Sequence, residues 1–558
     1  MIKRSTLYIS WLVMLVAGGA MQGCSTTKPY AESAIKTFDP DTSHIEMPPE
    51  QPQYQYWDRI DNTIFHQLEK PLNLNRVGRW LGISNKRQAD NINKLDEVPE
   101  SSWYTYRHYH QEMSPEELAT GPSTEAPDTD GKWTIFKAKL EGANSGFFIK
   151  DENGNRYLIK FDGYDYPELT TAADAISTKV FYAAGYTVPE SIITYFDPNK
   201  VTIGEGVTVE ENGKKRVMTM DDYREIVKGR PQNEDGKVRA LASKFVDGIP
   251  LGPWSFEGTL KEDPNDRVAH EHRRELRGMR VISSWLNDTD RRDANTMAVY
   301  NDEGYIDHYV QDFGNTLGAN GTSIHQPIQG QAYLIDPRYM LVSAFSMGGY
   351  VMPWEQIEPE VPYPAVGYFR ADVFKPGRWV PTHPLPPFEN MTLRDAFWGA
   401  KQVMSFSDED IQAIVATGEY SNPKAEEYVA QILMERRDKI GRYWFAKINP
   451  LDKFEVFVDG DELRFSFRDL SVDGKLVEES DHQYEIKVRS ENRSLSVIET
   501  FSEPKMIVEL NGDIFTDDVL HFDITTLGKE LVGNNKRVTV YIELKDGNSR
   551  VVGIEREE

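Results

Sequence analysis

The spacing of apolar and polar positions divides the chain into regions of different character. Strand-like alternation or short apolar runs occur at 133–140, 147–149, 157–161, 192–196, 239–246, 297–300 and 308–310. Helical spacing occurs at 169–184, 271–286, 408–416 and 424–447. From about residue 452 the pattern becomes all-β, with six alternating segments between 454 and 544 separated by polar turns. The order of these elements predicts an α+β protein that ends in an immunoglobulin-like β-sandwich.

Composition shifts suggest where the regions begin and end. Residues 24–55 are rich in Pro, Ser, Thr and Glu and read as a flexible tether. Residues 56–130 carry helical patterns and form an N-terminal extension. We expect two structured regions at 131–250 and 251–450, the second containing a Pro-, Gly- and aromatic-rich stretch at 319–390, and then the sandwich at 451–558.

The N-terminus has the layout of an export signal. Lys3 and Arg4 precede an apolar run from Leu7 to Ala17, which is too short to span a bilayer, and small residues follow it. Cys24 is the only cysteine of the chain, and the residues before it resemble the lipobox of bacterial lipoproteins. That resemblance implies a signal peptide at 1–23 and lipidation of Cys24. Ser25 resembles the sorting pattern for the outer membrane, either on its periplasmic face or at the cell surface. The alternative is a plain secretory signal followed by a chance cysteine.

The charge balance excludes one class of partner. Acidic residues outnumber basic ones, 89 to 63, for a net charge of −26. Because nucleic-acid binding requires Lys and Arg gathered on one face, we expect no nucleic-acid partner. A nucleotide cofactor remains compatible, since it needs only a local site.

Oxygen-rich side chains gather around a predicted β-hairpin in the middle of the chain. Asp290, Arg291 and Asn295 follow the helix at 271–286, and Asp312-Phe313-Gly314 follows the hairpin. The hairpin should bring Asn295 and Asp312 close enough to share a divalent cation, which prefers such oxygen ligands. Phosphoryl transfer needs these parts together with a cation on the phosphates and a carboxylate that orients it.

With Lys160 in the earlier strand hairpin, this pattern resembles the atypical kinases: the phosphatidylinositol 3/4-kinases, the HipA toxin kinases and the CotH-like secretory kinases. Asp290-Arg291-Arg292 matches their D-R-H at two of three positions, with Arg292 in place of His, and Asp312-Phe313-Gly314 matches their metal loop. The resemblance implies a two-lobed kinase-like domain, with the N-lobe at 131–250 and the C-lobe at 251–450.

The resemblance also implies roles for individual residues. Lys160 would hold the phosphates of ATP and Asp174 would orient it, with Glu168 as the substitute candidate. Asn295 and Asp312 would bind Mg²⁺ or Mn²⁺, and Asp290 would accept the hydrogen bond of the attacking hydroxyl. A glycine-rich loop would cover the phosphates with backbone N–H groups; its residues are Gly142, Asn144, Ser145 and Gly146.

Three alternative functions are compatible with this interpretation of the sequence. The first is a membrane-anchored kinase that transfers phosphate or AMP from ATP to an envelope protein, lipid or glycan. Because the space beyond the inner membrane normally lacks ATP, the second is a catalytically inactive kinase-like scaffold that binds a partner in the envelope. The third is a lipoprotein associated with cell-wall polysaccharide, suggested by the aromatic residues at 350–400.

Overall fold

The computed structural model describes residues 35–50, 86–139, 145–211, 214–460, 462–490, 496–509, 518–528 and 536–558. The chain divides into two units, Met1–Ile35 and Lys36–Glu558, and the architecture below belongs to the second. The predicted signal peptide, Cys24, Gly142, Asn144 and the helical patterns at 57–68 and 74–81 lie outside the described residues. Among the described residues, no helix combines the length and apolar character needed to cross a bilayer.

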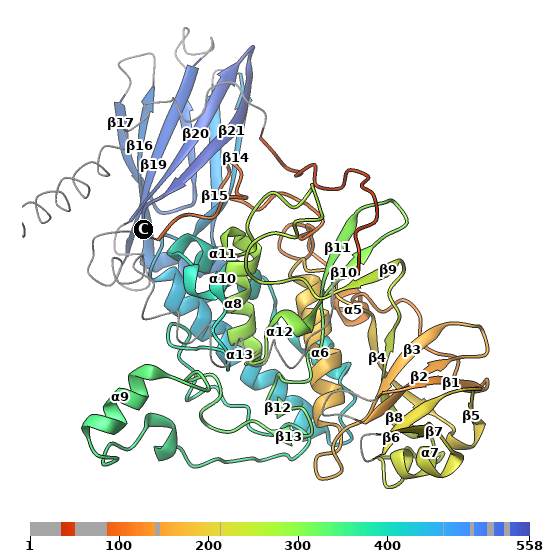
Figure 1. The fold of residues 1–558 in the computed structure, drawn as a ribbon. Helices are drawn as coiled ribbons and strands as arrows, with labels where there is room; N and C mark the ends of the chain where they lie inside the picture. The colour runs from red at the N-terminus through yellow and green to blue at the C-terminus, as the bar shows by residue number, and fades with distance from the viewer. Residues whose placement is uncertain are drawn as a thin grey trace, which may run out of the picture. The chain divides into compact units, whose positions relative to one another are not determined.

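A six-stranded sheet forms the first structured region. Its strands are β1 (Trp133–Ala138), β2 (Gly146–Lys150), β3 (Arg156–Lys160), β4 (Ser191–Phe196), β5 (Val201–Ile203) and β8 (Val238–Lys244), in the order β4-β8-β3-β2-β1-β5. The long helix α6 (Leu169–Ala183) joins β3 to β4 and packs beside β4 and β8 through Ala175, Ile193 and Leu241 (Figure 1). Smaller elements follow β4: η2 (Pro198–Lys200), β6 (Thr208–Glu211), β7 (Lys214–Val217) and α7 (Met220–Val227).

The strand period of two decides where Lys160 points. In β3, Tyr157 and Ile159 are fully buried in the core of the sheet, while Leu158 and Lys160 lie on the opposite face. That face is the one turned toward the second region.

The second region combines a three-stranded sheet with helices. The sheet has the order β11-β10-β9 and consists of β9 (Ile249–Gly252), β10 (Thr296–Tyr300) and β11 (Ile306–Val310). The helices are α8 (Arg274–Leu286), α10 (Pro386–Asn390), α11 (Leu393–Met404), α12 (Asp408–Ala416) and α13 (Pro423–Phe445). Short elements complete it: η3 (His270–His272), η4 (Asp293–Asn295), β12 (Ala319–Asn320), β13 (Ser323–Ile324), α9 (Pro337–Phe345) and η5 (Pro353–Gln356). Capping boxes at Thr392–Asp395 and Ser407–Asp410 fix where α11 and α12 begin.

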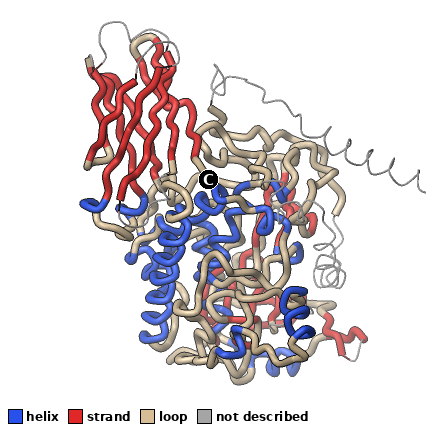
Figure 2. Tube along the Cα trace, turned by 90° about the vertical axis from the view of Figure 1, so that its left-hand side faces the viewer, coloured by secondary structure: helices blue, strands red, loops and turns tan. Residues whose placement is uncertain are grey.

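The last region is all-β apart from short helical turns. One sheet has the order β14-β15-β18 and the other β17-β16-β19-β20-β21. Figure 1 shows β17, β16, β19, β20 and β21 side by side, and Figure 2 shows the strands of this region in red. The strands are β14 (Leu451–Asp459), β15 (Glu462–Asp469), β16 (His482–Ser490), β17 (Ser496–Phe501), β18 (Lys505–Glu509), β19 (Asp518–Gly528), β20 (Arg537–Lys545) and β21 (Asn548–Arg556), with the helical turns α14 (Leu470–Asp473) and η6 (Glu479–Asp481). Residues of both sheets share one core, in which the rings of Phe465 and Phe522 lie 4.6 Å apart. The α+β class is therefore confirmed, and the immunoglobulin-like connectivity stays a prediction.

The segment before the first sheet differs from the prediction. Part of the predicted tether packs on the folded unit: Asp41 is 4% exposed and accepts hydrogen bonds from Ser102, and Ile45 is buried. Within the described part of the predicted helical extension, α5 (Pro115–Thr120) is the helix, and residues 86–110 run as turns and extended chain. Local composition misses this packing because the partners of residues 39–45 lie far along the chain.

Residues 86–110 also tie the helices to the sandwich through buried charges. Asp96 is 2% exposed and lies 2.6 Å from Arg274, 2.6 Å from Arg394 and 3.2 Å from Arg556 of β21. Burial alone would raise the pKa of Asp96, but the three guanidinium groups outweigh it and hold the pKa at about 2. Removing one member of such a cluster is strongly destabilising, because it leaves a buried charge unpaired.

Candidate active site

Three segments far apart in the sequence meet at Lys160. Its Nζ lies 3.2 Å from Oδ2 of Asp174 on α6 and 3.4 Å from Oδ1 of Asp312, which follows β11. The Lys160 and Asp174 side chains are 16% and 4% exposed, whereas Asp312 is 56% exposed. The ammonium group is thus held between one buried carboxylate and one that faces solvent.

The electrostatics of the site keep Lys160 and Asp312 charged. Burial would lower the pKa of Lys160, but Asp174 and Asp312 outweigh it and raise the pKa above its usual value. The pKa of Asp312 is lowered, chiefly by Lys160 and also by Arg291 and Lys139. At neutral pH the site therefore presents a lysine cation beside an ionised, accessible aspartate.

Asp174, not the substitute Glu168, is the partner that α6 supplies. Glu168 precedes α6 in a left-handed conformation with φ of 69°, and its Oε2 accepts a hydrogen bond from the Ser421 N–H at 3.0 Å. Asp174 lies farther along α6 and also accepts from Thr178 Oγ1 at 3.3 Å. Glu168 is therefore held at the start of α6 by Ser421, and Asp174, within the helix, is the carboxylate that contacts Lys160.

Asp290 is fixed in place by two amides and an arginine. Asn295 Nδ2 lies 3.3 Å and Asn315 Nδ2 lies 2.8 Å from Asp290 Oδ2, and Arg292 Nε lies 3.3 Å from Oδ1. Asn295 Nδ2 also donates to the Asp290 carbonyl at 2.6 Å. Asn315 was not expected from the sequence; its position three residues after Asp312, in the same loop, is the signal that points to it.

The β10–β11 hairpin brings the two predicted metal residues to one end of the sheet. β10 and β11 pair from Thr296–Val310 to Tyr300–Ile306, and next to the Thr296–Val310 pair, at the open end of the hairpin, the Gln311 N–H donates to the Asn295 carbonyl at 3.0 Å. Asn295 and Gln311 are thus neighbours across the hairpin, and Asp312 comes next.

A buried arginine locks the loop of Asp290 to the loop of Asp312. Arg291 is fully buried, lies 2.7 Å from Asp288 and donates to the carbonyls of Gln311, at 2.9 Å, and of Asp312. Burial raises the pKa of Asp288 to about 6, against the opposing effect of Arg291. The arginine of the D-R motif therefore acts as a structural clamp.

Packing of Phe313 couples Asp312 to the helix that carries Asp174. Asp312 has a φ of 58°, which turns its side chain out while Phe313 points into the core. The Phe313 ring stacks on Phe181 of α6 at 4.8 Å. A side chain in place of Gly314 would come within 2.9 Å of Thr170 Cγ2, at the start of α6. The position of Asp312 therefore depends on that of α6.

The described end of the glycine-rich loop lies directly across from Lys160. Gly146 is the register partner of Lys160 in the β2–β3 ladder, and a Cβ at Gly146 would come within 2.2 Å of the Ile159 carbonyl oxygen. Ser145 Oγ accepts a hydrogen bond from Arg230 Nη2 at 2.9 Å. Only glycine fits at position 146. The described end of the loop therefore lies beside Lys160, the residue expected to hold phosphates.

The donor set suits a hard divalent cation with phosphate oxygens completing its shell. Asn295 uses its amide nitrogen on Asp290, which leaves Oδ1 as its ligating atom, and Asp312 offers an exposed carboxylate. Asn315 Oδ1 is buried and has no hydrogen-bond partner among the described residues, so it could accept a hydrogen bond from a bound ligand or its water. Among the described residues no group of three or more His, Cys, Asp or Glu could hold a metal by itself.

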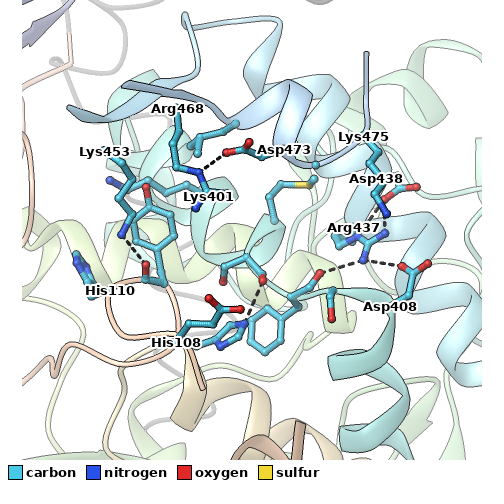
Figure 3. Close-up of a pocket in the computed structure, with 18 of the residues that line it drawn as sticks. His108, His110, Lys401, Asp408, Arg437, Asp438, Lys453, Arg468, Asp473 and Lys475 are labelled. Atoms are coloured by element: carbon cyan, nitrogen blue, oxygen red, sulfur yellow. Dashed lines mark hydrogen bonds and ion pairs between the residues drawn. The ribbon is translucent and has the colours of Figure 1, made fainter. Parts of the chain in front are cut away.

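A second cavity lies away from this site, between the segment at 108–112, helices α11 to α13 and strands β14 and β15 (Figure 3). Its volume is about 630 Å³. Figure 3 shows charged side chains around it, among them Arg437, whose Nη1 lies 2.8 Å from Asp408. Lys401 also lines the cavity, and its Nζ lies 2.8 Å from Asp452. The first pair joins α13 to α12, and the second joins α11 to β14 of the sandwich.

Comparison with known proteins gives weak structural likenesses and no family. No protein-family model and no curated protein matches the chain. The proinflammatory kinase CtkA of Helicobacter pylori is similar at a TM-score of 0.28 and 11% identity, over 54% of this chain and 90% of CtkA. The Golgi casein kinase with Mn/ADP bound is similar at 0.26 and 10%, over 73% and 95% of the two chains. A further structure of the Golgi casein kinase gives 0.26 and 9%, over 72% and 95%. All three are kinases, but scores this low do not establish a common fold, so function depends here on the side chains themselves.

Proposed function

We propose that this chain is an atypical kinase that transfers a phosphoryl group, or AMP, from ATP to a hydroxyl of an envelope substrate. The observation that carries the proposal is the meeting of Lys160, Asp174 and Asp312 at 3.2 and 3.4 Å, contributed by β3, α6 and the loop after β11. Phosphoryl transfer is mainly positioning and charge neutralisation, which needs this constellation beside a loop that fits phosphates.

Each residue has a task in the proposed reaction. Lys160, oriented by Asp174, holds the phosphates of ATP under the loop that ends at Gly146. A divalent cation, held by Asn295 and Asp312, would neutralise charge on the transferring group. Asp290 accepts a hydrogen bond from the attacking hydroxyl and aligns it. The Asn295 and Asn315 amides and the Arg292 guanidinium hold the Asp290 carboxylate in a fixed orientation.

We also propose that the protein is a lipoprotein anchored through Cys24 to the outer membrane. The supporting observation is the position of the sole cysteine after an apolar run and small residues. Incorporation of radiolabelled palmitate into the wild type and its absence in Cys24→Ser would support the anchor, and equal labelling of both would refute it.

The test of catalysis uses two labels. Purified protein is incubated with Mg²⁺ and ATP labelled at either the α- or the γ-phosphate, with the protein itself and envelope fractions as acceptors. Label from the γ position identifies phosphoryl transfer, and label from the α position identifies AMP transfer. Asp290→Asn and Asp312→Asn should each abolish it, while Asp302→Asn, in the exposed turn of the same hairpin, should not.

Ligand stabilisation separates the kinase from the inactive scaffold. A wild type that Mg²⁺ and ATP stabilise against heat, with no transfer of either label, would identify a nucleotide-binding scaffold. No stabilisation and no transfer would reject the nucleotide site altogether.

A further inference from the structure

One exposed segment of the second region carries no charge. In a chain whose residues are 27% charged, positions 339–354 contain no Asp, Glu, Lys, Arg or His. They cover most of α9, a glycine-containing turn and the start of η5. We call this stretch the uncharged segment. Its composition is that of a protein interior, so its exposure requires a reason.

The uncharged segment exposes an unusual amount of apolar surface. Met347 is 96% exposed, Phe345 is 86%, Met340 is 60% and Leu341 is 58%. A helix that is apolar around its circumference is normally buried, and contiguous apolar patches mark sites of association with protein or membrane. The segment therefore fits an apolar partner.

Exposure on two sides of α9 favours a lipid surface over a peptide. One side lines a groove of about 570 Å³ with Met340, Ala344 and Met347. Leu341, 58% exposed, and Phe345 lie outside that groove. A peptide seated in the groove would leave these two side chains in water, whereas a bilayer interface would cover both sides together.

The ends of the uncharged segment have the residues that lipid interfaces favour. Tyr339 and Trp354 pack edge to face at 4.7 Å, and Tyr350 is 44% exposed. Aromatic rings with a polar atom concentrate at the boundary between lipid and water. A nine-residue helix such as α9 is only about 14 Å long, far short of the ~30 Å hydrocarbon core, so it would lie in the plane of the interface.

Backbone hydrogen bonds connect the chain just before the uncharged segment to the loop of Asp290. The Leu334 N–H donates to the Thr382 carbonyl, and the Thr382 N–H donates to the Thr289 carbonyl, each at 2.8 Å. Thr289 immediately precedes Asp290. A surface that holds the uncharged segment would therefore also hold the acceptor side of the candidate active site close to it.

We infer that the uncharged segment is a membrane-docking element that inserts its apolar side chains into the lipid interface. The inference gains support from the proposed anchor, because residues 25–35 span at most about 40 Å when extended and so confine the folded unit near the bilayer. It does not require catalysis. A protein partner in the groove is the alternative that the experiment must separate from it.

The test places one fluorophore on the segment. Full-length protein is purified from envelopes and reconstituted into phosphatidylcholine vesicles with or without brominated acyl chains. A cysteine is introduced at Val342 and coupled to an environment-sensitive dye; Phe457→Cys, at a position 53% exposed on β14, is the matched control. We expect a several-fold stronger quenching by brominated lipid at 342 than at 457, insensitive to salt. Phe345→Asp should remove most of that quenching.

The outcomes are separable. Equal quenching at 342 and 457 overturns the inference. Quenching at 342 that survives Phe345→Asp but disappears in Ala344→Trp, which fills the groove, also overturns it and indicates a groove ligand. If two dyes couple to each chain, Cys24 is free and the lipid anchor is absent. The measurement is then made on full-length Cys24→Ser protein mixed with the same vesicles, and quenching at position 342 decides whether the segment docks on the membrane. Phosphoryl transfer is assayed separately with soluble ATP, so its failure leaves this result intact.

Discussion

Replacing Lys160 by methionine removes the charge at the centre of the candidate active site while keeping the length of the side chain. Asp174, 4% exposed, would lose the ammonium group 3.2 Å away and keep only the Thr178 hydroxyl among the partners described above. Asp312 would lose a partner at 3.4 Å but remains 56% exposed to solvent. The two carboxylates should therefore respond very differently.

The magnitudes follow from burial. Removing one partner of a buried ion pair costs about 3–5 kcal/mol, since the other charge is left uncompensated. An exposed pair contributes only about 0–1 kcal/mol. Nearly all of the loss in Lys160→Met should therefore come from Asp174, and Lys160→Met/Asp174→Asn should recover much of it. Catalysis should not recover, because loss of a preorganised group that stabilises charge lowers the rate by about 10²–10³.

The assay compares thermal unfolding midpoints and initial rates of label transfer for the wild type, both single variants and the double variant. We expect a midpoint several degrees lower in Lys160→Met, partial restoration in the double variant, and transfer lost in both. The single variant Lys132→Met, at an exposed position just before β1, serves as the control for removing a lysine. Two results would refute the claim that a buried charge pair organises this site. One is an unchanged unfolding midpoint in Lys160→Met, and the other is a double variant that is less stable than Lys160→Met.

Two further predictions concern the surroundings of the site. Asn315→Leu removes the amide 2.8 Å from Asp290 Oδ2, so we expect transfer to fall about tenfold or more while ATP still raises the unfolding midpoint as in the wild type; a parallel loss of ATP binding would contradict this role. Because arginines hold the pKa of the buried Asp96 at about 2, its stabilising contribution is present above pH ~4, the value of a free Asp, and is lost as pH falls through 2. That contribution is worth roughly 2–3 kcal/mol, so unfolding midpoints should drop steeply between pH 4 and 2 in the wild type and less steeply in Asp96→Asn; identical slopes would show that the Asp96 cluster does not contribute.

The sequence by itself determined those features that depend on neighbouring residues. Strand alternation and helical spacing placed α6, α8, α12 and α13 within a few residues of their observed bounds, because apolar periods of 2 and 3.6 are written locally. The hairpin between Asn295 and Asp312 was readable for the same reason, since a turn between two strands joins positions that are close along the chain.

Only the tertiary structure decided which distant groups meet. Lys160 and Asp312 are separated by 152 positions. Asp174 rather than Glu168 contacts Lys160, because Glu168 lies before α6 and accepts a hydrogen bond from the distant Ser421 N–H. Long-range contacts also explain why residues 39–45 pack on the folded unit and why the Asn315 amide donates a hydrogen bond to Asp290. Exposure of the uncharged segment could not be predicted from the sequence either, because an apolar run looks the same whether it is buried in a core or lies at the surface.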